Sequence, residues 1–181
     1  MPPTPITEQL QQSVGVICKV IGQIPAFHVY EEYVSHRFAS GEVETALKAM
    51  THNAALDSTL INLRCFNEFF RPGGWPDDVR AYHFPAVTFQ PFLAPADAQA
   101  IDKYLAHITT QRSDIVTKPW LIDDMVILGL QRGIEFLTHI ETSFPIHDEV
   151  KANELRGVRE VVRRLIPRIA KLHETKVAYQ T

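Results

Sequence analysis

One short segment of the sequence carries most of the polar residues whose types and spacing could do chemistry. On a helix, Lys103, His107 and Thr110 lie on one face, because positions three and four apart are neighbours. Arg112 follows just over one turn beyond His107. We predict a polar stripe centred on this imidazole, the side chain most often used to move protons near neutral pH.

A second group of polar residues interrupts an apolar run earlier in the chain. Arg64 and Glu68 are four positions apart, and Asn67 is one step from Glu68. We expect Arg64 to be partly buried, and a buried guanidinium needs an acceptor. Asp57, Glu68 or Asp102 could each supply it. Asp102 and Asn67 are the candidate binding residues of this group. We further expect this guanidinium to share one polar patch with the imidazole at position 107.

These residues resemble the HEPN superfamily of small helical bundles. Its signature is an Arg, a polar residue such as Asn, His or Asp, four residues and then a His, often with Ala before it. Here Asp102, Ala106 and His107 stand at the polar, Ala and His positions, but Ile101 stands at the Arg position.

The region between residues 55 and 140 is also similar to a family of uncharacterised bacterial proteins. In that family, a helix with an Arg, an acid four positions later and a Phe precedes a helix with Lys, His, Thr and Arg at fixed spacing. The matching residues in this chain are Arg64, Glu68 and Phe69 in the first helix and Lys103, His107, Thr109 and Arg112 in the second.

The resemblance implies a module that binds or dimerises without catalysis. In catalytic HEPN ribonucleases, the Arg and His of two protomers face one another and act on RNA phosphate. Ile101 cannot stabilise an anion, and Lys103 and Arg112 are not at the family's position. We therefore expect a homodimer that contacts RNA or a protein partner. One alternative is a ribonuclease that uses His107 with Arg64, Lys103 or Arg112.

A second alternative is a purely structural interaction domain. The aromatic loop from Trp75 to Phe92 would then be its docking surface, if the loop is exposed.

The last predicted helix is the most basic part of the chain. Residues 148–176 contain eight Lys and Arg and five acids, although the whole chain has a net charge of −3. Arg156, Arg159, Arg163 and Arg164 gather on one side. They form either a solvated face with ion-pair partners or a strip that contacts RNA, for which Arg159 and Arg163 are the candidate residues.

The sequence gives little indication of a metal or cofactor site. The eight histidines include no pair with HxxxH spacing. Two Glu–His pairs four positions apart, Glu32 with His36 and Glu135 with His139, would have to converge to bind a metal. Asp123 and Asp124 are interpreted as helix caps and solvated charge. Phosphate-binding and dinucleotide-binding glycine motifs are absent. We predict no metal and no cofactor.

The elements that position these residues are predicted to be helices. Apolar residues recur at steps of three and four, and no apolar runs bracket a hairpin turn. Breaks at Pro and Gly bound helices at residues 7–22, 27–38, 42–70, 95–112, 119–142 and 148–176. We predict an all-α, up-and-down bundle of four or five main helices, capped by the first two. It is a single domain over residues 1–181, with a flexible tail at 1–5 and an ordered aromatic loop at 71–94.

The composition is that of an ordinary globular domain. The chain has 181 residues, of which 45% are hydrophobic and 22% charged, and this disfavours disorder. It shows no signal-peptide pattern and no apolar run of membrane-spanning length. We expect a cytoplasmic protein with no membrane contact, whose Cys18 and Cys65 are buried thiols.

Overall fold

The computed structural model describes residues 7–37, 42–75, 78–106 and 122–178, which form helices and loops with no strand among them. The predicted all-α fold is confirmed, with six α-helices within these ranges where four or five main ones were expected. They are α1 (Thr7–Gln23), α2 (Ala26–Tyr33), α3 (Glu42–Phe69), α4 (Pro95–Ala106), α6 (Ile122–Ser143) and α7 (Glu149–Ala178). Two short 3₁₀ turns, Ser35–Arg37 and Ala81–His83, accompany them.

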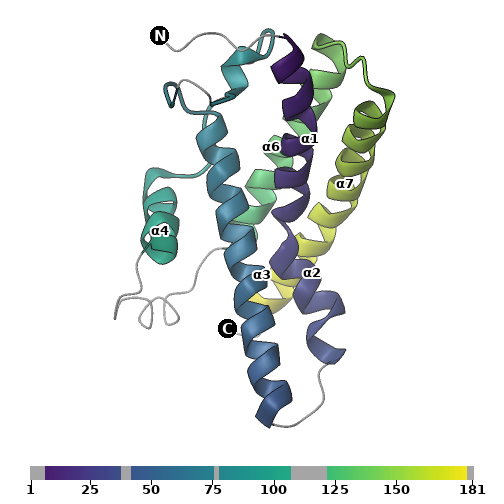
Figure 1. Cartoon of the computed structure of the whole chain (residues 1–181). Helices are drawn as coiled ribbons and strands as arrows, with labels where there is room; N and C mark the ends of the chain where they lie inside the picture. Colours follow the sequence, from purple (N-terminus) through teal and green to yellow (C-terminus); the bar gives the residue numbers. More distant parts are fainter. Residues whose placement is uncertain (1–6, 38–41, 76–77, 107–121, 179–181) are drawn as a thin grey trace.

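Four long helices, α1, α3, α6 and α7, build the bundle (Figure 1). The prediction that the first helix caps the bundle is wrong, because α1 packs against α3, α6 and α7. Its apolar row, Leu10, Val14, Ile17 and Ile21, is buried and faces the core. The periodicity showed that one face of α1 is buried, but not which helices bury it.

The loop before α4 closes one side of the core with aromatic rings. Phe66, Phe69 and Phe70 at the end of α3 meet Phe84, Phe89 and Phe92 of the loop and Phe136 of α6. Most of these ring pairs are edge-to-face, an arrangement that adds to the free energy of burial. The expectation that this loop packs over the core is met at these three loop rings.

Two glycines let α6 approach its neighbours closely. A Cβ added at Gly129 would lie 2.7 Å from Leu63 of α3, and one added at Gly133 would lie 2.9 Å from Ile21 of α1. Both distances are shorter than a van der Waals contact. Both helices therefore approach α6 more closely than any residue with a side chain would allow at these positions.

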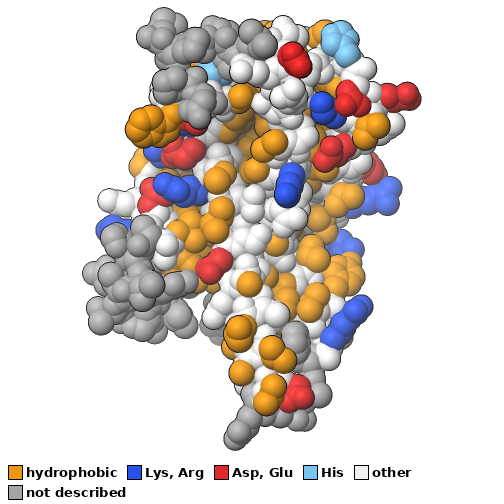
Figure 2. All heavy atoms as spheres, viewed as in Figure 1, with side chains coloured by type: hydrophobic (Ala, Val, Ile, Leu, Met, Phe, Trp, Pro, Cys, Tyr) orange, Lys and Arg blue, Asp and Glu red, His pale blue; other side chains and the backbone are white. Residues whose placement is uncertain are grey.

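The first half of α3 projects beyond the other helices, with α2 at its side (Figure 1). From Val43 to Ser58 no residue is buried, and the first buried one is Thr59. Tyr30 of α2 donates a hydrogen bond to the backbone oxygen of Lys48 at 2.9 Å. Figure 2 shows hydrophobic side chains gathered over this end of the molecule.

Within the described residues, no single helix is long and apolar enough to cross a bilayer. The pair α1 and α2, bent by 46°, reaches that length and composition only when the two are taken together.

Candidate functional site

The centre of the predicted polar stripe lies outside the described residues. His107, Thr109, Thr110 and Arg112 all fall in the range 107–121. Lys103 is described and is exposed in the last turn of α4. The expected patch of Arg64 with His107 therefore stays a prediction.

Arg64 is tied to α4 by an ion pair. Its Nε meets a carboxylate oxygen of Asp102, which is one of the three acceptors anticipated from the sequence. Both side chains are about half exposed, so Arg64 is only half-buried. The reason is that this part of α3 faces outward beside the short α4. An exposed pair of this kind contributes at most about 1 kcal/mol to stability.

Asn67, a predicted binding residue, is buried and anchors the aromatic loop. Its Oδ1 accepts hydrogen bonds from the backbone N–H groups of Phe92 and Leu93, both at 2.9 Å. Two buried backbone donors that would otherwise lack partners are satisfied in this way. These partners could not be predicted from local sequence patterns, because they lie 25 and 26 positions away.

Five arginines of α7 are paired with acids. Arg164 donates to Glu160 at 2.8 Å, and this hydrogen bond lowers the pKa of Glu160 below its usual value. Arg163 also pairs with Glu160, and Arg159 and Arg156 pair with Glu141. Arg168 reaches Glu32 of α2. These pairs match the interpretation of a solvated face with ion-pair partners, one of the two alternatives for this helix.

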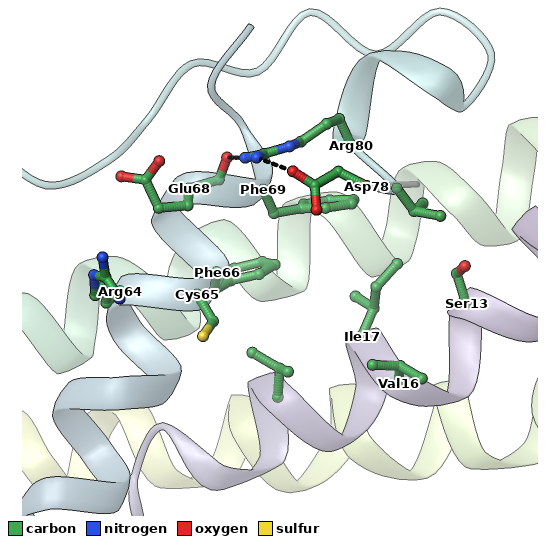
Figure 3. Close-up of a pocket in the computed structure, with 12 residues that line it drawn as sticks. Ser13, Val16, Ile17, Arg64, Cys65, Phe66, Glu68, Phe69, Asp78 and Arg80 are labelled. Atoms are coloured by element: carbon green, nitrogen blue, oxygen red, sulfur yellow. Dashed lines mark hydrogen bonds and ion pairs between the residues drawn. The ribbon is translucent and has the colours of Figure 1, made fainter. Parts of the chain in front are cut away.

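A groove of about 570 Å³ lies between α1 and α3 (Figure 3). Its floor is apolar, formed by the largely buried side chains of Ile17, Phe66 and Phe69. Val16, which is 64% exposed, and Cys65 lie at the rim of the groove. A cleft of this size with an apolar floor is typical of a binding site.

One end of the groove is closed by the segment after the Pro–Gly turn. Arg80 donates to Asp78 Oδ2 at 2.5 Å and to the backbone oxygen of Glu68 (Figure 3). The backbone N–H of Trp75 and the Arg80 guanidinium hold the pKa of Asp78 below its usual value. Gly74 is required here, because its φ is +118° and a Cβ would lie 2.5 Å from Asp78 Oδ2.

A buried polar network joins α2, α6 and α7 on another side of the bundle. His28 Nε2 donates to Asp123 Oδ1 at 2.7 Å, and His173 Nδ1 donates to Asp123 Oδ2 at 3.2 Å. Asp123 is 5% exposed, so its interpretation as solvated charge is wrong. Sequence reasoning missed this network because its members lie 95 and 50 positions apart.

No group of three or more metal-ligating side chains that could hold a metal ion occurs within the described ranges. Asp123 is instead held by hydrogen bonds to the two imidazoles. The two predicted Glu–His pairs are Glu32 with His36, whose side chain is not described, and Glu135 with His139. His139 Nε2 donates to the backbone oxygen of Pro85 at 2.7 Å.

The two cysteines differ in environment, and both are free. Burial, with a smaller effect from Glu154, raises the pKa of the Cys18 thiol to about 12. Cys65 is exposed, so the expectation of a buried thiol is wrong for it. Its side chain points from α3 into the groove, on the side that faces α1 (Figure 3).

In comparisons with known protein families, curated proteins and solved structures, nothing matches this chain. The resemblance to the HEPN superfamily therefore stays a prediction.

Proposed function

We propose that this chain is an HEPN-like helical module that works by binding and self-association without catalysis, and that a homodimer forms through the projecting half of α3. The observation that carries the proposal is an exposed apolar row on α3. We call this row the α3 seam and define it as Val43, Leu47, Met50 and Ala54.

The spacing of the α3 seam is that of a helix which packs against another helix. Its members follow at steps of four, three and four, the repeat found at the a and d positions of coiled coils. Val43, Leu47 and Met50 are 68%, 47% and 67% exposed. Ile61, seven positions after Ala54, continues the row and is also exposed. Such a row of large apolar side chains in water marks an interaction surface.

A second copy of the chain fits the α3 seam without electrostatic conflict. The positions that flank the seam are Glu44, Ala46, Thr51 and Asn53, with one charge among them. Two copies related by a twofold axis would bring their seams face to face, so that each surface meets its own equivalent. Only Glu44 among these flanking residues is charged, and this allows close approach.

The exposure of this half of α3 also favours a partner. Helical segments of about 12–15 residues are marginal in water, and most of their stability in proteins comes from packing of an apolar face. Tyr30 of α2 covers one side of the segment, where it contacts Thr51 and His52 of α3. A second copy would cover the seam, which lies on a different side of α3 from these contacts.

The charges support a protein partner more than RNA. Arg159 and Arg163 are engaged by Glu141 and Glu160. Arg64 is engaged by Asp102. The net charge of −3 adds no general attraction to a phosphate backbone.

Light scattering coupled to size-exclusion chromatography tests the homodimer. The wild type should have the mass of two chains at micromolar concentration. Leu47→Glu and Met50→Glu should weaken dimerisation at least about 10-fold, because each buries a carboxylate against an apolar seam. Val161→Glu is the matched control, since Val161 is an exposed apolar residue on α7. A wild type that stays monomeric would contradict the proposal.

An RNA cleavage assay tests the absence of catalysis. The wild type and His107→Ala are incubated with a panel of RNA oligonucleotides, and both should leave them intact. Cleavage by the wild type that is lost in His107→Ala would favour the ribonuclease alternative.

A further inference from the structure

We infer that the groove between α1 and α3 is a docking site for an amphipathic helix of a partner protein. This inference concerns a different surface from the α3 seam and does not depend on the homodimer.

The walls of the groove have the form that a docking helix needs. On α1, the residues that line it are Ser13, Val16, Ile17 and Val20, at positions i, i+3, i+4 and i+7. Facing them are residues of the last two turns of α3, which runs in the opposite direction (Figures 1 and 3). Two facing rows of this kind can receive the side-chain ridge of a third helix.

The apolar surface of the groove is open to solvent. Val16 lies off the buried row of α1, yet it is a large apolar side chain that is 64% exposed. Val20 and Val79 are partly buried and continue the apolar lining. Covering these side chains with the apolar face of a partner helix would remove them from water, at about 25 cal/mol per Å².

The charges at the rim determine the partner's chemistry. Arg64 and Glu68 stand one helical turn apart on α3 and have opposite signs. Arg64 meets Asp102 through Nε, and its terminal nitrogens are the donors suited to a further carboxylate. A partner helix with an acid opposite Arg64 and a Lys or Arg opposite Glu68 would be complementary to this rim.

The same charges argue against a nucleic acid or a simple anionic lipid in the groove. Asp78 and Arg80 pair with each other, and Glu68 pairs with Arg71 at 3.0 Å. The rim therefore has no excess of positive charge to attract an anion.

Fluorescence anisotropy of a dye-labelled peptide tests the inference. The peptide has about 15 residues, with Leu at positions i, i+3, i+4 and i+7 and with Glu and Lys one turn apart beside this row. A scrambled peptide of the same composition is the first control. The amphipathic peptide should bind saturably, and the scrambled one should bind at least about 10-fold more weakly.

Substitutions in the protein test whether the peptide binds in the groove. Val16→Arg should abolish binding without unfolding the protein, because the side chain is exposed. Val161→Arg, at an exposed apolar site on α7, should leave binding unchanged. Exchanging the charges of Arg64 and Glu68 should weaken binding of the original peptide. The same exchange should strengthen binding of a peptide in which Glu and Lys are exchanged.

Alkylation of Cys65 gives an independent readout. Cys65 lines the groove and is exposed, whereas Cys18 is buried with a pKa of about 12, so a thiol reagent should label Cys65 alone. The peptide should slow this labelling at least about 10-fold at saturation. Leu47→Glu, which disrupts the α3 seam, should leave the protection intact.

Several outcomes would overturn the inference. They are equal binding of the two peptides, binding that survives Val16→Arg, no binding at all, or protection of Cys65 by an amphiphile such as dodecanoate and not by the peptide. None of these outcomes bears on the homodimer, which is measured by molecular mass.

Discussion

The carboxylate of Asp123 links helices α2, α6 and α7 through hydrogen bonds. It lies in the first turn of α6 and accepts from His28 of α2 and His173 of α7. His28 is also buried, so a lost acceptor could not be replaced freely by water. The network fixes where the C-terminal part of α7 lies against the rest of the bundle.

Removing this carboxylate should destabilise the fold. We expect Asp123→Ala to lower the free energy of unfolding by about 1–3 kcal/mol, because it leaves the buried Nε2 donor of His28 without an acceptor. Asp124→Ala is the matched control, since the carboxylate of Asp124 is about half exposed. This substitution should change the free energy of unfolding by less than about 0.5 kcal/mol. Urea denaturation followed by circular dichroism measures both. Equal effects of the two variants would contradict this role.

His83 should make stability depend on pH. Burial, with a smaller effect from Arg80, lowers the pKa of His83 below its usual 6.5. The neutral ring accepts a hydrogen bond from the backbone N–H of Arg80 through Nδ1 at 3.1 Å. A group with a lowered folded-state pKa adds stability above 6.5, and this contribution is lost as the pH falls through the folded-state value.

The pH dependence can be separated from that of the other histidines by substitution. Between about pH 7.5 and 5.5, the wild type should lose more stability than His83→Gln, which has no titrating group at this position. Thermal unfolding at a series of pH values measures the difference. Parallel curves of stability against pH for the two proteins would show that His83 contributes nothing to the pH dependence.

At the scale of the elements, the close approach of α6 to α1 rests on a glycine. Gly133 faces Ile21, which is fully buried and β-branched, so its methyl group cannot move away easily. By contrast, Gly157 in α7 has nothing within 4 Å of the place where a Cβ would be.

The two glycines should therefore respond in opposite ways to alanine. Gly133→Ala should lower the free energy of unfolding by about 1–3 kcal/mol through overpacking. Gly157→Ala should raise it by about 0.5–1 kcal/mol, because alanine is the better helix former. Chemical denaturation of the pair tests the contact. A stabilising Gly133→Ala would mean that α6 lies farther from α1 than the structure has it.

Helix positions could be predicted from the sequence, since they depend on local patterns. The stretch from Glu42 contains no Gly or Pro until Pro72, and α3 runs from Glu42 to Phe69 as one helix. Which helices face one another is a property of tertiary packing, and α1 was misplaced for that reason.

The candidate site was only partly predictable. The Arg64–Asp102 pair was among the three expected alternatives, because a guanidinium that leaves water in part needs an acceptor. The groove was not expected, since its walls come from segments about fifty positions apart. One signal could have indicated it: Val16 is apolar but falls outside the buried row of α1.

At the scale of the whole molecule, two apolar surfaces remain open after the bundle has formed. One is the α3 seam on the projecting arm, and the other is the groove beside the core. Both border on α3, at its two ends. The proposed homodimer would use the first and leave the second free for a partner helix.

The most direct test of the homodimer is cross-linking through the α3 seam. Met50→Cys is made in a Cys65→Ser background, where the remaining Cys18 is buried and unreactive. A bis-maleimide reagent that spans about 10 Å, the separation of packed helices, is added at micromolar protein. We expect a covalent dimer for Met50→Cys and almost none for Val161→Cys on α7. A Met50→Cys protein that stays monomeric, or equal cross-linking at both positions, would contradict it.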